Sequence, residues 1–97
     1  MTPTLDAIRK HKHQIEEIGE RYGVSNVRIF GSVANGRATE SSDLDLLVAI
    51  ESGRSLLDII GFEIDVSEML GCPVDVVSER ALKPALAKEV LQETFVL

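Results

Sequence analysis

Two aspartates stand at alternate positions where an apolar segment begins. Asp43 precedes the run at residues 44–50 and Asp45 lies inside it, and the apolar content of this run predicts a β-strand. Because side chains alternate between the two faces of a strand, the carboxylates project to the same side, with Cα atoms roughly 6.5 Å apart. Two carboxylates this close repel each other unless a cation lies between them. Oxygen ligands of this kind suit Mg²⁺, which takes its remaining ligands from water and from substrate phosphates.

A third carboxylate lies in another short apolar run. Asp75 is flanked by valines in residues 73–77, which predict a further strand. A lone aspartate in such a run would be costly to bury without a partner. If this strand lies beside the one that carries Asp43 and Asp45, the three acids form one metal cluster. We therefore expect all three to be metal ligands and to carry the catalysis.

A glycine–serine pair follows a β-branched and aromatic run at residues 27–30, which predicts another strand. Gly31 permits a sharp exit from that strand and a close approach of the backbone to a ligand. The residues from Ser32 to Arg37 can form a short helix whose N-terminal amides face an anion, and the Ser32 hydroxyl adds a donor. The pattern is not a P-loop, because no Lys-Ser or Lys-Thr pair follows it. Together with the acids, this turn supplies what is needed to hold a nucleoside triphosphate and its magnesium.

The remaining segments predict helices layered on a sheet. An amphipathic helix is expected over residues 3–22, another from a Ser55 cap to Leu70, and a last one over residues 84–93, before a short edge strand at residues 95–97. The order of elements predicts an α/β fold. The apolar stripe of the first helix is expected to be Leu5, Ile8, Ile15 and Ile18. That of the second is expected to be Leu56, Leu57, Ile60, Ile64 and Leu70.

Length and composition bound the kind of protein. The 97 residues are 44% hydrophobic and 27% charged, which is typical of a single globular domain spanning residues 1–97. No stretch reaches the roughly 18 apolar residues of a membrane span, so a cytoplasmic protein without membrane contact is expected. Cys72 is the only cysteine, which permits no internal disulfide and suits a reducing compartment. The net charge of −6 argues against direct binding of nucleic acid through its phosphates.

The spacing of the candidate residues resembles that of a known superfamily. Gly31-Ser32, ten intervening residues and Asp43-x-Asp45 resemble the G-S-x10-D-x-D motif of the DNA polymerase β-like nucleotidyltransferases, and Asp75 lies where their third carboxylate would. The resemblance implies a small mixed, palm-like β-sheet layered with helices, with the acids on one exposed face. Many relatives carry Arg at the position of Asn35, and we expect Arg37 to supply this positive charge to the phosphates.

The short length resembles that of the minimal nucleotidyltransferases, the antitoxin partners of HEPN-domain toxins. This resemblance implies a Mg²⁺-dependent protein adenylyltransferase that moves AMP from ATP to a tyrosine of its cognate HEPN ribonuclease toxin, within a hetero-oligomer, and so silences it. Two metals bound by the three acids would clamp the attacking and leaving oxygens, while Gly31 and Ser32 hold the β and γ phosphates. Asp75 would help to deprotonate the attacking hydroxyl.

Two other functions remain open on the sequence. The chain could modify a small molecule, as antibiotic nucleotidyltransferases do, although those enzymes carry an extra helical domain that is missing here. Alternatively, it could neutralise a partner by binding alone, with a vestigial site. The intact glycine–serine turn and the three acids weigh against this second alternative. An adjoining reading frame for a short helical protein with an Arg-x4-6-His motif would favour the antitoxin.

Overall fold

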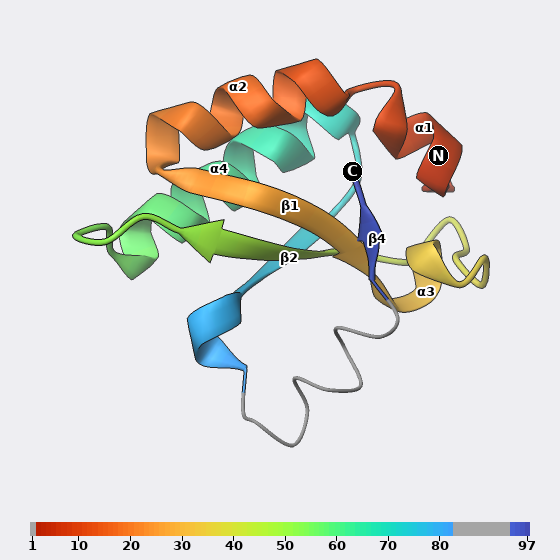
Figure 1. Ribbon diagram of the computed structural model, residues 1–97. Helices are drawn as coiled ribbons and strands as arrows, with labels where there is room; N and C mark the ends of the chain where they lie inside the picture. Colours follow the sequence, from red (N-terminus) through yellow and green to blue (C-terminus); the bar gives the residue numbers. More distant parts are fainter. Residues whose placement is uncertain (1, 83–93) are drawn as a thin grey trace.

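A mixed four-stranded sheet forms the middle of the molecule. The computed structural model describes residues 2–82 and 94–97, with strands β1 (Val24–Phe30), β2 (Leu44–Ile50), β3 (Val74–Ser78) and β4 (Phe95–Val96). Their order across the sheet is β3-β2-β1-β4 (Figure 1). Strands β2 and β3 run parallel, whereas β1 is antiparallel to both β2 and β4. The predicted α/β class, the mixed sheet and the short edge strand near the end of the chain are confirmed.

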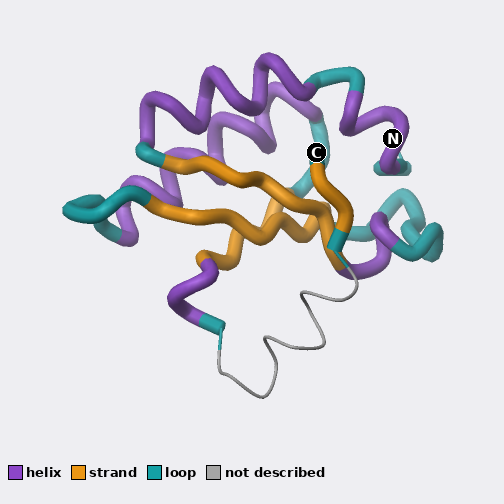
Figure 2. The backbone as a smooth tube through the Cα atoms, in the orientation of Figure 1, coloured by secondary structure: helices purple, strands orange, loops and turns teal. Residues whose placement is uncertain are grey.

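Helices cover one face of this sheet. Helices α1 (Leu5–Arg9), α2 (Lys12–Tyr22) and α4 (Leu56–Leu70) lie together above the strands in Figures 1 and 2, while the short α3 (Gly31–Ala34) lies at the end of β1. A 3₁₀ turn, η1 (Glu79–Ala81), follows β3. The helix expected over residues 84–93 lies outside the described residues. Of the helices that the structure describes, none combines the length and the apolar character that crossing a bilayer requires.

The single helix predicted over residues 3–22 is wrong, because the chain turns between α1 and α2. The His11 amide donates to the Ile8 carbonyl at 3.0 Å, and His11 itself has the non-helical angles φ −103° and ψ 17°. The turn directs α1 so that the Arg9 guanidinium donates to the Val96 carbonyl at 3.1 Å. Ile8 and Ile15 are nevertheless both fully buried. Residues seven positions apart keep the same helical phase, so the hydrophobic period could not reveal the break.

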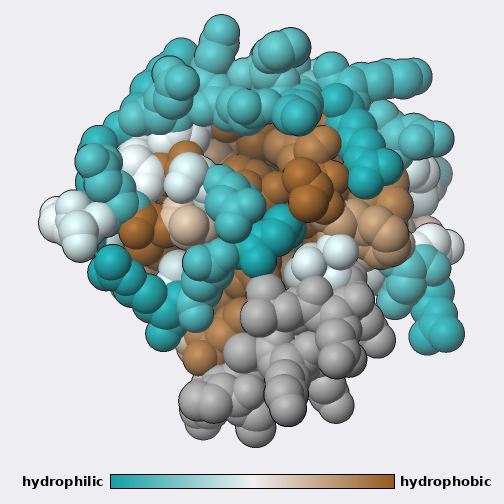
Figure 3. Space-filling view, viewed as in Figure 1, coloured by the Kyte–Doolittle hydropathy of each residue, from teal (hydrophilic) through white to brown (hydrophobic). Residues whose placement is uncertain are grey.

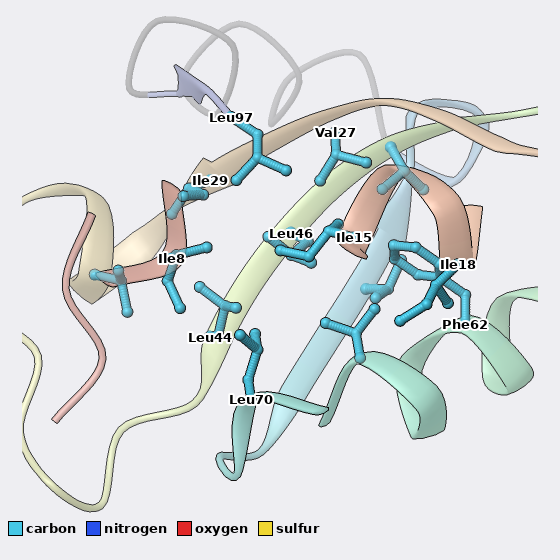
Figure 4. Close-up of a cluster of buried hydrophobic side chains, with 14 of the residues drawn as sticks. Ile8, Ile15, Ile18, Val27, Ile29, Leu44, Leu46, Phe62, Leu70 and Leu97 are labelled. Atoms are coloured by element: carbon cyan, nitrogen blue, oxygen red, sulfur yellow. The ribbon is translucent and has the colours of Figure 1, made fainter. Parts of the chain in front are cut away.

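The core lies between the sheet and helices α2 and α4 (Figure 4). Leu44, Leu46 and Val48 are fully buried in it, as the alternation along β2 predicts. Leu47 projects to the opposite face and is also fully buried, which the alternation does not predict. There the side chain of Arg28, the cross-strand neighbour of Leu47 on β1, reaches across β2 to an ion pair with Glu79 beyond β3. The Arg28–Glu79 ion pair therefore lies on the same face of the sheet as Leu47.

Helix α4 begins and ends where its sequence predicts. The Ser55 side chain accepts from the Leu57 amide at 3.2 Å and the Asp58 carboxylate accepts from the Ser55 amide at 2.9 Å, forming a capping box. Gly71, with φ +72°, ends the helix in the left-handed conformation. Cys72 follows and is buried.

The predicted buried stripe of α4, in contrast, is wrong except at Leu70. Phe62, Val66 and Leu70 face the core, while the other four predicted residues are exposed. The rotation of the helix is set by Tyr22 of α2, whose ring packs on Gly61 and whose hydroxyl donates to Asp65 at 2.7 Å. The exposed residues are Leu56 (69%), Leu57 (77%), Ile60 (40%) and Ile64 (52%).

Candidate active site

The register of the parallel strands brings two of the predicted acids together. Asp45 of β2 is the direct cross-strand partner of Asp75 of β3, and adjacent strands lie about 4.8 Å apart. The Leu44 amide donates to the Pro73 carbonyl at 2.8 Å, which aligns the two strands where they begin. Asp43 lies one residue before β2. The acids therefore lie at one end of the sheet, on the face opposite the buried Leu44 and Leu46.

The three carboxylates differ in exposure. Asp43 and Asp75 are exposed to solvent, whereas Asp45 is partly buried between its neighbours on β1 and β3. The exposure of Asp75 agrees with the expectation that the acids lie on one exposed face of the sheet. Because β3 is at the edge of the sheet, its outer residues remain open, and the Val76 amide is satisfied instead by the Glu63 carboxylate at 3.0 Å. An exposed Asp75 is accessible to an incoming molecule.

Gly31 lies directly against Asp45. It follows β1, whose last residue Phe30 pairs with Asp45, and it has φ +76°. A Cβ atom at this position would collide with the Asp45 carboxylate, so both the backbone angle and the space require glycine. The turn at the start of α3 is thereby placed beside the acids, which brings together the two halves of the sequence motif.

Helix α3 is shorter than the predicted segment from Ser32 to Arg37, since it ends at Ala34. The Asn35 side chain accepts from the Arg37 amide at 3.2 Å, and Gly36 adopts φ +76°, so these residues form a turn instead. The Arg37 side chain is exposed and makes no hydrogen bond or ion pair with the residues that the structure describes. Its guanidinium is free to bind an anion, and its role at the phosphates stays a prediction.

A group of hydroxyl residues shapes the loop that leads to Asp43, and the sequence analysis did not single it out. The Thr39 amide donates to the Ser42 hydroxyl at 2.8 Å, and the Ser42 amide donates to the Thr39 carbonyl at 3.1 Å. The Ser41 hydroxyl lies 3.1 Å from that of Thr39. The signal was present as a run of small hydroxyl residues just before an aspartate, a composition that favours local side-chain to backbone hydrogen bonds. These hydrogen bonds fix the conformation of the loop that precedes Asp43.

The electrostatics of the site favour a cation. Partial burial raises the pKa of the Asp45 carboxyl, and the negative charges of Asp75 and Asp43 raise it further. Within residues 2–82 and 94–97, no three His, Cys, Asp or Glu side chains converge into a ready metal cage. The donor set still fits Mg²⁺, which is commonly held by one or two carboxylates and completes its octahedral shell with water and phosphate oxygens.

Arg28 and Glu79 border the acids on the same face of the sheet. Arg28 precedes Phe30 by two residues, and its side chain is only 11% exposed. Burial lowers the pKa of its guanidinium from the usual value. Alternation with the buried Ile29 could have placed Arg28 on this face, but nothing in the sequence indicated that Glu79 would be its partner.

Comparison with known proteins defines the class. The nucleotidyltransferase domain family matches residues 11–97, so the chain belongs to this family of enzymes. The protein adenylyltransferase MntA of Thermococcus cleftensis is 44% identical to it over 78 residues, which cover 80% of this chain and 79% of that protein.

Solved structures agree on the fold. A structure described provisionally as a minimal nucleotidyltransferase superposes with a TM-score of 0.86 at 46% identity, covering 97% of this chain and 96% of the other. A toxin–antitoxin complex with AMP-PNP superposes with a TM-score of 0.74 at 18% identity, covering 88% and 70%. A complex of a tri-AMPylated Shewanella oneidensis HEPN toxin with its MNT antitoxin does so with 0.67 at 16% identity, covering 91% and 69%. At such low identity, these two complexes show a shared fold.

Proposed function

We propose that this nucleotidyltransferase is a Mg²⁺-dependent protein adenylyltransferase of the cytoplasm that moves AMP from ATP to a tyrosine of a HEPN-domain toxin and thereby acts as its antitoxin. The observation that carries the proposal is the pairing of Asp45 with Asp75 directly beside Gly31. The relative from Thermococcus, which is named as a protein adenylyltransferase, supports the reaction. The AMPylated Shewanella toxin in complex with an antitoxin of the same fold supports the kind of partner.

Asp43, Asp45 and Asp75 are the residues that would hold Mg²⁺. When bound, Mg²⁺ neutralises phosphate charge and polarises the phosphorus that is attacked. The carboxylates then lose the mutual repulsion that disfavours ionisation of Asp45. Asp43 and Asp75 are exposed and can turn toward a ligand, whereas the partly buried Asp45 forms the fixed member of the set.

Ser32, the first amides of α3 and Arg37 would bind the β and γ phosphates. The first amides of a helix lack intrahelical acceptors and point outward, and a serine hydroxyl can donate to a phosphate oxygen. In the transfer, the tyrosine oxygen bonds to the α-phosphorus, and the bond from that phosphorus to the bridging oxygen breaks. Pyrophosphate leaves, and Asp75 accepts the phenolic proton.

The proposal is tested by following the label of ATP into the partner. The chain is incubated with Mg²⁺, the product of the adjoining reading frame, and ATP labelled at either the α or the γ phosphate. Label from the α position alone should appear on the partner, and Asp43→Asn should abolish it. Glu40→Gln, which changes an exposed acid of the same loop, is the matched control and should leave transfer intact.

Two results would contradict the proposal. Transfer of the γ label would indicate a kinase. A partner that stays unlabelled but is neutralised equally well by the Asp43→Asn protein would show that the chain acts by binding alone.

A further inference from the structure

Helix α4 presents an apolar face to solvent over its N-terminal two thirds. Leu56, Ile60 and Ile64 recur every four residues, and Leu57 lies seven residues before Ile64, so the four side chains form one stripe. Each is between 40% and 77% exposed. The stripe lies on the opposite side of the helix from Phe62 and Val66, because residues two apart are about 200° apart around a helix. We call these four residues the α4 apolar face.

Carboxylates lie at both ends of this face. The helix contains four acidic residues and no lysine or arginine. Glu68 is exposed at the C-terminal end of the stripe, and Asp58 lies near its N-terminal end. The nearby cation, Arg54, is already occupied by Glu51 at 3.3 Å and by Asp58 at 3.4 Å. The surface therefore combines an apolar centre with a negatively charged rim.

This charge pattern decides what can cover the face. A second copy of the chain would bring acidic rims together, with no lysine or arginine on either α4 to pair with them, and each copy carries a net charge of −6. Like charges in contact oppose association, whereas a complementary rim steers it. We infer that the α4 apolar face docks a second protein whose contact surface has an apolar centre fringed by lysine and arginine. This partner is the HEPN-domain protein of the proposed function, on which the identification rests, and its acceptor tyrosine would approach the acids at the other face of the sheet.

The docking surface and the reactive carboxylates lie on opposite faces of the sheet. Helix α4 packs on one face of the sheet (Figure 1), the face that buries Leu44 and Leu46. The alternation along β2 and the register of β2 with β3 place Asp45 and Asp75 on the other face. Docking on α4 therefore leaves the acids uncovered and free to take up ATP. Changes in one surface should leave the other intact, which makes the two functions separable by mutation.

Binding of the product of the adjoining reading frame, which the proposed function expects to be a HEPN protein, tests the inference when it is measured by calorimetry without ATP. The double variant Leu57→Ser/Ile64→Ser should weaken binding at least tenfold, since exposed apolar anchors at the centre of an interface dominate affinity. Glu68→Lys should also weaken binding, and the loss of affinity should be larger at low salt than at high salt. Val96→Ser is the matched control, because Val96 is a 69% exposed aliphatic residue on β4, and it should bind as the parent does. Melting temperatures and ATP binding should match the parent in all variants.

Each outcome bears on the inference separately from the reaction. Parent-like binding by Leu57→Ser/Ile64→Ser overturns the docking surface even if AMP is still transferred. Loss of binding in that variant supports the surface even if the parent transfers no AMP, a result that would overturn only the proposed function. If the parent chain sediments as a dimer and the double variant as a monomer, a second copy occupies the face and the inference is overturned. A parent chain that does not bind the HEPN protein would also overturn it.

Discussion

At the scale of single residues, Asp45 is held in place by contacts on several sides. Its carboxylate is paired in register with Asp75, lies against the backbone of Gly31 and is partly withdrawn from water. Burial disfavours ionisation of this carboxyl and raises its pKa, and the negative charges of Asp75 and Asp43 raise it further. A residue kept where it costs stability is a candidate for function rather than for folding.

Asp45→Asn should stabilise the metal-free protein at neutral pH. A carboxyl whose pKa is higher in the folded state opposes folding above that pKa and has no effect below its unfolded value of about 3.9. The gain in melting temperature over the parent should therefore be largest near pH 7 and shrink as the pH falls through the raised pKa. Thermal unfolding in a chelator at several pH values measures this. A variant that melts below the parent at pH 7 would show that Asp45 is structural.

Ser32→Ala should weaken ATP binding or transfer by about 1 to 3 kcal/mol, the usual contribution of a hydrogen bond to a charged group. Ser52→Ala is the control, because Ser52 is an exposed hydroxyl in the turn between β2 and α4. Steady-state kinetics with varied ATP separate the two variants. Unchanged kinetics for Ser32→Ala would mean that the turn after β1 only connects elements.

At the scale of elements, the structure shows why some features are predictable from sequence and others are not. The bounds of β2 and the N-terminal cap of α4 follow from local rules, namely apolar composition after polar residues and a serine followed three positions later by an aspartate. Both signals lie within a few residues of the feature that they predict. The placement of Gly31 near Asp45, 14 positions further along, was instead implied by the resemblance to the superfamily motif.

The features that the sequence analysis missed depend on distant contacts. Helix α4 has apolar residues on two sides, and the buried side is the one on which Gly61 meets the Tyr22 ring and Phe62 enters the core. The ion pair of Arg28 with Glu79 joins residues that are 51 positions apart. Hydrophobic periodicity carries no information about either contact.

Gly61→Ala tests the contact that orients α4. An added Cβ would lie 2.5 Å from the Tyr22 ring, so the substitution should destabilise the protein by about 1 to 3 kcal/mol despite the higher helix propensity of alanine. In a Tyr22→Ala background the ring is absent, and the same change should instead stabilise by up to about 1 kcal/mol. Urea unfolding of the four proteins in this cycle gives both values. An equal effect of Gly61→Ala in the two backgrounds would show that Tyr22 does not set the rotation of the helix.

At the scale of the whole molecule, the sheet separates two kinds of surface. One face buries the core under α2 and α4 (Figure 1), and the strand register places Asp45 and Asp75 on the other face. A third region, a hollow of about 330 Å³ between α2 and the β1–β4 edge, has both apolar residues and the acids Glu16 and Glu20 in its lining. In Figure 3, teal side chains follow α2 along the top and brown apolar atoms gather below them. Acidic groups thus occur in more than one place on this chain.

Paramagnetic broadening of amide signals can show which of these acidic regions binds the metal and the nucleotide. In spectra of the labelled chain with ATP, Mn²⁺ in place of Mg²⁺ should broaden the amide signals of Gly31, Ser32, Asp45 and Asp75 first and leave those of the α4 apolar face sharp. Asp45→Asn should remove the effect. Broadening centred on Glu16 and Glu20, or no selective broadening at all, would contradict the assignment of the active site to the paired acids beside Gly31.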